Sequence, residues 1–446
     1  MRNFVFPLLF ALAPLLAAMP QVQVGTVAPP PLPEPFRLED AIELSGAAHP
    51  KVRRAQAERA LAGVERLEAE ADQGFTADAR IQGRYIEPNA AAGDQSRNDS
   101  SVTLSLRQPL YDFGRAETAL QAAETEYQAR DVEVEQVGIE QRLEVLRRYF
   151  DVVEADLAFN VVNEGMAIAF IRWDRLTDRN ELGQVSDIDV SEAHAAFNRL
   201  RAAVRAAATR QRSARALLAN ALNRPGALPS TVEAPELRGN ARALEEFPLL
   251  LAAAQRHNPE LRVLRGRLAA AEYRLQAALA SSRPTLSAQF DAGAWNRELG
   301  GRDAWAAGLV LDIPLFTGGR RDARTERRRA ERDRLQADLD AARLDIRQRL
   351  LEAWLAVDVA RVRVEEAQVT LDYRDLYLDR SRALYELEAQ ADLGDAMTRW
   401  SEARLAQAEV DHALAMALAR LDALTGAPVF ERLQGVGAVA VDAVAK

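Results

Sequence analysis

The sequence has no cysteine among its 446 residues. This absence excludes a disulfide framework, a cysteine-based metal site, thiol chemistry and a lipid anchor on an N-terminal cysteine. There are only four histidines, and no two of them lie three or four positions apart, so we expect structural roles and neither a metal site nor another cofactor. A serine-nucleophile motif, a phosphate loop and a dinucleotide-binding turn are also missing. The sequence therefore gives no sign of an enzyme.

Aromatic residues are scarce, at 6%, whereas hydrophobic residues make up 48% and charged residues 28%. Much of the apolar content is alanine, and a chain rich in Ala, Leu, Glu and Arg is typical of long packed helices. The formal charge of −9 argues against nucleic acid as a partner. Basic runs such as "RRDARTERRRAERDR" contain interleaved acidic residues, which favours a solvated helix surface.

A long uncharged apolar run occurs only at the N-terminus. Residues 1–18 have the layout of a secretory signal peptide, because one Arg precedes an apolar run that ends in small residues. An N-terminal membrane anchor is the alternative, although the run is short for one and two prolines interrupt it. Residues 19–37 are rich in proline and are predicted to form an extended strap. A chain exported in this way could be periplasmic, secreted, or built into the outer membrane as strands.

Two parts of the chain follow the same order of elements. Each starts with a helix that proline opens, at Pro50 and at Pro259, and continues with two stretches of alternating apolar and polar residues. Each pair of alternating stretches predicts a β-hairpin. The predicted boundaries are 38–222 and 245–426 for the two repeats, about 75–110 and about 285–316 for the hairpins, 223–244 for a crossover of mixed structure, and 427–446 for a C-terminal tail.

Each hairpin is followed by an unusually long stretch without proline. A helix of about 65 residues would measure about 97 Å, whereas typical globular helices have about 11–12 residues. A short break then leads into a returning helix. The helix before each hairpin and the returning helix add up to about the length of the long one, so they could stack end to end beside it. The predicted long helices are about 115–179 and about 320–387, and the returning helices are about 187–222 and about 392–424.

The same turn joins strand to long helix in both repeats, as "PLYDFGR" and as "PLFTGGR". Proline removes a ladder donor and is expected to end the strand, glycine allows backbone angles that other residues resist, and arginine falls in the first helical turn. Four strands are too few to close a barrel, and only a closed barrel can span a membrane with strands, so the strands would have to come from several chains. Three chains would give twelve. The residues of the two turns are Pro109, Gly114 and Arg115, and Pro314, Gly319 and Arg320.

Together these features resemble the TolC-type outer-membrane efflux proteins over nearly all of the mature chain. The resemblance also includes the paired segments "FRLEDAIELSGAAHPKVRRA" and "FPLLLAAAQRHNPELRVLRG" and the helix starts "SDIDVSEA" and "ADLGDAMT". It implies a mainly α fold with a small β part. Three chains would share a 12-stranded β-barrel, four strands each, on top of a periplasmic tunnel of long helices.

The same resemblance implies a function in the outer membrane of a Gram-negative bacterium. The homotrimer would sit in outer-membrane lipid and work with a periplasmic adaptor and an inner-membrane pump. It would conduct substrate passively, with a gate at the periplasmic tip and without covalent chemistry. The main alternative is a periplasmic coiled-coil protein, structural or adaptor-like, which would account for the long helices but would need neither the strands nor the repeated turn.

The breaks between long and returning helices carry the candidate functional residues. The resemblance implies that Asp392 and Asp395 narrow the periplasmic entrance; helix capping is the alternative, and both roles can coexist. Asp187 and Asp189 follow Ser186 at the other break, where we expect capping first and closing contacts at the tip second. The remaining candidates, for adaptor docking or for ordinary turns, are Leu182, Gly183, Leu387 and Ala391.

Overall fold

The computed structural model describes residues 32–46, 49–89, 92–226, 230–297, 303–387 and 392–434. The chain divides into two units, Met1–Leu32 and Pro33–Lys446, and the second holds all the helices and strands named below. The predicted signal peptide at 1–18 lies outside the described residues, as do most of the predicted strap and residues 435–446 of the predicted tail. These assignments stay predictions.

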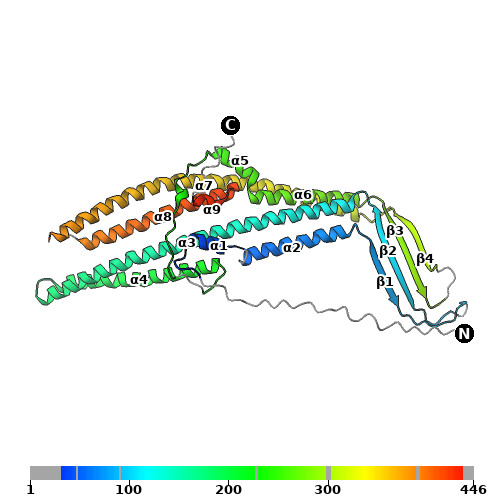
Figure 1. Ribbon diagram of the computed structural model, residues 1–446, viewed down its shortest axis with the longest axis horizontal. Coiled ribbons are helices and arrows are strands. Elements are labelled where there is room, and N and C mark those ends of the chain that lie inside the picture. The colour runs from blue at the N-terminus through cyan, green and yellow to red at the C-terminus, as the bar shows by residue number, and fades with distance from the viewer. Residues whose placement is uncertain are drawn as a thin grey trace. The chain divides into compact units, whose positions relative to one another are not determined.

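The second unit contains the same series of elements twice (Figure 1). The first series is α1 (Leu38–Leu44), α2 (Pro50–Ala71), β1 (Thr76–Gln82), β2 (Ser101–Tyr111), α3 (Arg115–Glu181) and α4 (Asp187–Ala221). The second is α5 (Phe247–His257), α6 (Pro259–Ala280), β3 (Thr285–Trp295), β4 (Trp305–Asp312), α7 (Arg320–Glu386) and α8 (Leu393–Thr425). A short 3-10 helix, η1 (Arg238–Ala241), lies between the series, and α9 (Val429–Leu433) follows α8.

The two long helices, α3 and α7, have 67 residues each, which corresponds to a length of about 100 Å. Both begin at the predicted arginine. α3 packs against α2 and α4, and α7 packs against α6 and α8. Figure 1 shows α2 and α4 following one another along α3, and α6 and α8 along α7. Because α3 also contacts α6 and α8, this one helix joins the first repeat to the second.

The strands form one antiparallel sheet in the order β1-β2-β3-β4. The central pair, β2 and β3, joins the hairpins of the two repeats. β1 and β4 are the edges, and within the described residues each pairs with one neighbour only. The sheet therefore ends in two unpaired edges within a single chain, which natural proteins normally cover or pair.

One cluster of the hydrophobic core lies where the short elements of the second repeat cover its helices. Leu250 and Ala254 of α5 pack there against Ile346 and Leu350 of α7, together with Leu421 of α8. In the first repeat the segment before α1 packs against the crossover in a corresponding way. The short elements of both repeats therefore lie near the middle of the long helices, and the turns lie at the two ends of those helices.

Candidate functional site

The two strand-to-helix turns pass through left-handed backbone. Gly114 has a φ of +77° and Gly319 a φ of +76°, and each is the N-cap residue of a long helix. Residues with a Cβ resist these angles, so glycine is needed at both positions. Arg115 and Arg320 are the first residues of α3 and α7.

The prolines of these turns act differently in the two repeats. We expected proline to end the strand, and for Pro109 this was wrong, because β2 continues to Tyr111. The register shifts between Pro109 and Tyr111, and this irregularity accommodates a residue that cannot donate a ladder hydrogen bond. In the second repeat β4 ends at Asp312, before Pro314.

Asp112 has a role that the sequence reading did not single out. Its carboxylate accepts hydrogen bonds from the backbone N–H groups of Arg115, at 3.1 Å, and of Ala116, at 2.8 Å. These are donors at a helix start that lack an intrahelical partner. An aspartate just before the glycine of "YDFGR" was the available signal. The second repeat has Thr317 at this place, and its backbone carbonyl accepts from Arg320 N–H at 3.3 Å.

The sheet separates apolar from polar side chains between its two faces. Strand pairing sets Leu104 opposite Ala79 and Ala292, and Leu309 opposite Ala288, so these residues share one face. By the same alternation that face also carries Ala77, Ile81, Val102, Leu106, Phe290, Ala307 and Leu311. The opposite face carries Asp78, Arg80, Ser105, Arg107, Gln289, Asp291 and Asp312, with Val310 and Trp295 as large apolar residues among them.

The two faces differ in whether their side chains find partners within the chain. On the polar face the Ser105 hydroxyl donates to Asp291 at 2.6 Å, and Arg107 forms an ion pair with Asp312 at 3.2 Å. On the apolar face Leu309 is 69% exposed and Ile81 is 81% exposed. Within the described residues this apolar sheet face is therefore left without a cover, which is a mark of a surface made for contact.

The first helix return, between α3 and α4, is closed by reciprocal capping. The Ser186 hydroxyl accepts from Asp189 N–H at 3.2 Å, and the Asp189 carboxylate accepts from Ser186 N–H at 3.1 Å and from the hydroxyl at 2.7 Å. These hydrogen bonds from Ser186 hold the pKa of Asp189 below its usual value. Asp187 accepts from the amide of Asn180 at 3.0 Å. Gly183 has a φ of +69° and makes the turn itself possible.

The second return, between α7 and α8, is capped by Asp392. Its carboxylate accepts from Asp395 N–H at 3.0 Å, and the Asp395 carboxylate forms an ion pair with Arg399 at 2.7 Å. Ala391, a predicted docking residue, lies outside the described residues. The capping expected at the first return is thus observed, and so is the capping given as the alternative at the second. The narrowing of an entrance by these aspartates stays a prediction. Leu182 and Leu387, at the ends of the long helices, are 71% and 76% exposed.

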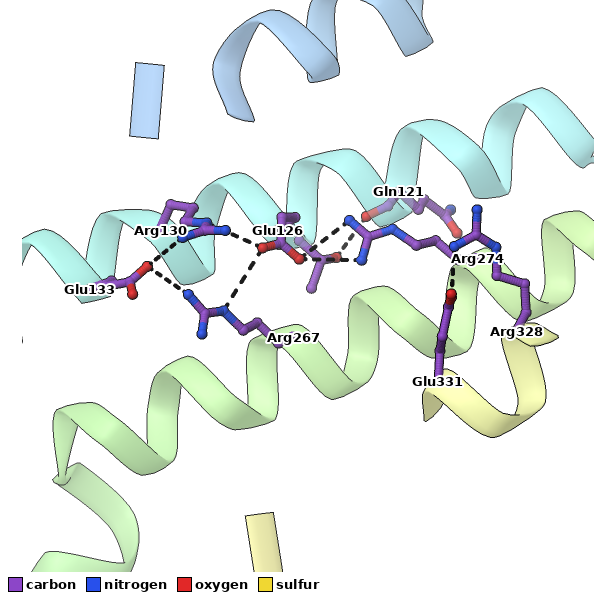
Figure 2. A network of polar contacts seen from close by, with 9 residues as sticks. Gln121, Glu126, Arg130, Glu133, Arg267, Arg274, Arg328 and Glu331 are labelled. Atoms are coloured by element: carbon purple, nitrogen blue, oxygen red, sulfur yellow. Dashed lines mark hydrogen bonds and ion pairs between the residues drawn. The ribbon is translucent and has the colours of Figure 1, made fainter. Parts of the chain in front are cut away.

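The contact between α3 and α6, here called the α3–α6 seam, is built on a network of ion pairs (Figure 2). The Glu126 side chain is only 11% exposed and lies 3.3 Å from Arg130 of its own helix and 3.3 Å from Arg274 of α6. Arg267 of α6 lies 3.9 Å from Glu126 and 2.7 Å from Glu133. Two carboxylates of one repeat are therefore shared among three guanidinium groups, and two of these belong to the other repeat.

The contact between α3 and α8, here called the α3–α8 seam, has fewer polar links. The Ser401 hydroxyl donates to Glu164 at 2.6 Å. The His412 ring is hydrogen-bonded to Glu154 at 2.9 Å and stacks on Phe150 with 4.3 Å between ring centres. His412 is buried and has the structural role that we expected for the histidines. Among the described residues, no carboxylate of this seam is shared among several cations as Glu126 is.

One face of α7 carries a heptad stripe, consisting of Leu355, Val362, Val369 and Leu376 at seven-residue spacing. These side chains are between 47% and 71% exposed. Apolar residues at this spacing are typical of a helix that packs along another helix. Beside the stripe, a cavity of about 1050 Å³ opens between α3, α6, α7 and α8. Its walls are mostly apolar, with Arg349, Arg363 and Arg420 among the lining residues.

Two further observations concern membrane-spanning helices and metal sites among the described residues. None of the helices in the described ranges combines the length and the apolar character that a membrane span requires. Among the same residues, no group of three His, Asp or Glu side chains is arranged to hold a metal ion.

Comparison with known proteins gives concordant results. A model of the outer membrane efflux protein family matches residues 42–224 and 250–427. The chain is 27% identical over 407 residues to the protein CyaE of Bordetella pertussis, covering 87% of this chain and 85% of that protein. It is similar in structure to the CmeC outer membrane channel of Campylobacter jejuni, with a TM-score of 0.71, 14% identity, and coverage of 90% and 89% of the two chains.

A second solved structure, described as the open state of the MtrE outer membrane channel of Neisseria gonorrhoeae, is also similar. Its TM-score is 0.68 at 19% identity, and 88% of this chain and 89% of that chain are covered. The duplicated match and the shared fold extend over both repeats. The chain belongs to the outer membrane efflux protein family.

Proposed function

We propose that this protein is the outer-membrane channel of a tripartite efflux or export system, which conducts substrate passively from the periplasm to the exterior. Its family is one of outer-membrane transport proteins and not of enzymes. We further propose that the chain itself catalyses no reaction, and that residues 1–18 are a signal peptide removed on export. The energy for transport then comes from a partner.

The single observation that carries this proposal is the sheet. Its apolar face is exposed, its polar face carries an ion pair and hydrogen bonds, and both its edges are unpaired among the described residues. A lipid-facing sheet needs one apolar face and a closed set of edges. Three copies, joined β4 to β1, would close twelve strands with the apolar face toward lipid and the polar face toward a water-filled pore.

The heptad stripe of α7 supports a homotrimer. Leu355, Val362, Val369 and Leu376 have no partner helix within the described chain that covers them. A neighbouring copy would bury this stripe over about 32 Å of helix. The polar sheet face and the cavity beside α7 would then belong to the wall of one continuous tunnel.

The exposed ends of the long helices are the proposed contact with other components. Leu182 and Leu387 offer apolar contacts to a periplasmic adaptor, which would link the tunnel to an inner-membrane pump. Asp392 and Asp395 would ring the entrance with six carboxylates in a trimer, and their repulsion would be reduced because each Asp395 is paired with Arg399. A similar structure described as an open state is consistent with an entrance that can widen.

A pair of substitutions on one strand tests the proposal. Leu104→Arg places a charge on the apolar face, and such a residue at mid-membrane costs about 2–4 kcal/mol per chain. We expect this variant to fail to assemble into detergent-stable trimers in outer membranes. Ser105→Arg is the matched control, since its side chain lies on the polar face between Asp78 and Asp291. Assembly of both variants at wild-type levels would contradict the channel and favour the coiled-coil alternative.

A further inference from the structure

Gly394 occupies an unusual place in the first turn of α8. A Cβ atom at this position would lie 2.8 Å from Cγ2 of Ile168 in α3 and 3.2 Å from its Cγ1. Even alanine therefore could not be accommodated unless Ile168 or the start of α8 moved. Glycine destabilises a helix relative to alanine. The close approach of α8 to α3 at this position explains why glycine is found here.

The two repeats differ at this position. Counted from the N-cap residue, Gly394 is the second residue of α8, and the second residue of α4 is Ile188. The Ile188 side chain is 77% exposed. In the second repeat the same position is in close contact with α3 of the other repeat. The first turn of α4 is instead held to α3 of its own repeat, where Asp187 accepts from Asn180 at 3.0 Å.

A second contact continues the first along the same two helices. Ser401 lies seven residues after Gly394, two helical turns further along one face of α8. Its hydroxyl donates to Glu164, which lies one turn before Ile168 on α3. The four residues thus make a steric contact and a hydrogen bond on facing sides of two helices.

We propose that Gly394, Ser401, Ile168 and Glu164 form a latch that positions the start of α8, and with it Asp392 and Asp395, at the channel entrance. The latch rests on the proposed channel function and names its regulating contacts. Asp392 and Asp395 flank Gly394 in sequence, so any shift of this first turn moves both carboxylates. Widening of the entrance then requires the latch to part while the rest of α3 stays in place.

Conductance of purified trimers in planar lipid bilayers tests the latch. Gly394→Val forces the first turn of α8 away from Ile168, and we expect the mean conductance to rise by at least about twofold. Gly394→Ala should give a smaller rise. Gly138→Ala is the matched control, because a Cβ there meets nothing within 4 Å. We expect it to conduct as the wild type does.

Two further variants separate positioning from general damage. Ser401→Ala should raise the conductance, whereas Ser401→Thr keeps the hydroxyl and should leave it unchanged. Ile168→Ala combined with Gly394→Ala makes room for the added methyl group, and should return the conductance toward the wild-type value. This reversal would not occur if Gly394→Ala acted only by weakening the fold.

The outcomes distinguish the latch from the function on which it rests. Trimers of Gly394→Val and Ser401→Ala that conduct like a conducting wild type would overturn the latch alone. If Gly394→Val does not assemble, the Ser401 pair and the double variant decide by the same criterion. A wild-type trimer that does not conduct at all would overturn the proposed channel and the latch with it.

Discussion

The same helix, α3, meets the second repeat in two different ways. Toward the sheet, the α3–α6 seam shares Glu126 and Glu133 among three arginines, and Glu126 is nearly buried. Toward the helix returns, the α3–α8 seam relies on single hydrogen bonds from Ser401 and His412. A carboxylate shared among several cations is harder to separate from its partners than one held by a single hydrogen bond. From this difference we propose that the sheet end of the helices holds its arrangement while the return end can rearrange.

A glycine in each seam, Gly266 and Gly394, shows the difference between the two contacts. A Cβ at Gly266 would lie 2.8 Å from Cβ of Ala129 in the α3–α6 seam, and a Cβ at Gly394 would lie 2.8 Å from Cγ2 of Ile168 in the α3–α8 seam. The neighbour of Gly266 is attached directly to the backbone of α3 and cannot turn away. The neighbour of Gly394 is a γ carbon of Ile168, whose branched side chain keeps its rotamer in a helix, but Gly394 itself lies in the first turn of α8, where a helix end can shift. Equal distances therefore mark a contact in the middle of a helix at one seam and a contact at a helix start at the other.

The largest effect is expected from Glu126→Ala. Three guanidinium groups lose a nearly buried carboxylate, and breaking such a pair costs about 3 kcal/mol of unfolding free energy. The matched change in the α3–α8 seam, Glu164→Ala, removes one hydrogen bond and should cost about 1 kcal/mol. Denaturant unfolding of detergent-solubilised trimers measures both. Equal losses would remove the distinction between the seams.

The next effect compares the two glycines. Gly266→Val overpacks a rigid contact and should lower the free energy of unfolding by about 2 kcal/mol. Gly394→Val should lower it by less than about 1 kcal/mol, because the start of α8 can shift. Thermal unfolding midpoints of the two variants provide the measurement. A larger loss for Gly394→Val would show that the α3–α8 seam is the rigid one.

A third prediction concerns His412. Replacement by Phe keeps an aromatic ring against Phe150 but leaves Glu154 without its partner, so we expect a loss of about 1 kcal/mol. His412→Ala removes the stacked ring as well and should cost more. The two unfolding curves, recorded side by side, separate the ring contact from the hydrogen bond. No difference between them would mean that stacking contributes nothing here.

Much of the fold could be predicted from the sequence, because it depends on local patterns. The absence of proline over the long helices and the glycine in each strand-to-helix turn fixed where α3 and α7 begin. The charge runs of α7 are satisfied locally, as when Glu331 pairs with Arg327 and Arg328 of the same helix. Such pairs follow from helical spacing alone.

The seams could not be predicted in the same way. Glu126 and its partner Arg274 are 148 positions apart, and nothing in either segment identifies the other. Gly394 stood in a quoted motif, but its purpose became visible only once α8 was placed against α3. Closing of the sheet by other copies depends on contacts that one chain does not contain. For this reason the trimer and the entrance remain proposals.

The smallest effect is a difference in pH dependence. Burial, and then the nearby Glu154, raise the pKa of Glu409 beside the α3–α8 seam above its ordinary value of 4.5. The folded state then binds this proton more readily than the unfolded chain, so stability rises as the pH falls from neutral toward 4.5. A hydrogen bond from Arg328 instead lowers the pKa of Glu331, which lies beside the α3–α6 seam (Figure 2). Its contribution is present above pH 4.5 and is lost as the pH falls through the lowered pKa.

Two substitutions check these opposite signs. Glu409→Gln should stabilise the trimer at pH 7, and this gain should disappear as the pH falls to 4.5. Glu331→Gln should destabilise it at pH 7, and this loss should disappear below pH 4.5. Unfolding midpoints across the pH range test both, and slopes of the same sign would contradict the assignment.

The most direct test of the central claim is hydrogen exchange of backbone amides in the wild-type trimer. We predict that residues 394–403 of α8 exchange much faster than residues 262–274 of α6, because the α3–α8 seam opens without unfolding the α3–α6 seam. Equal protection of the two segments, or faster exchange in α6, would contradict a channel that is held at the sheet end and opens at the helix returns.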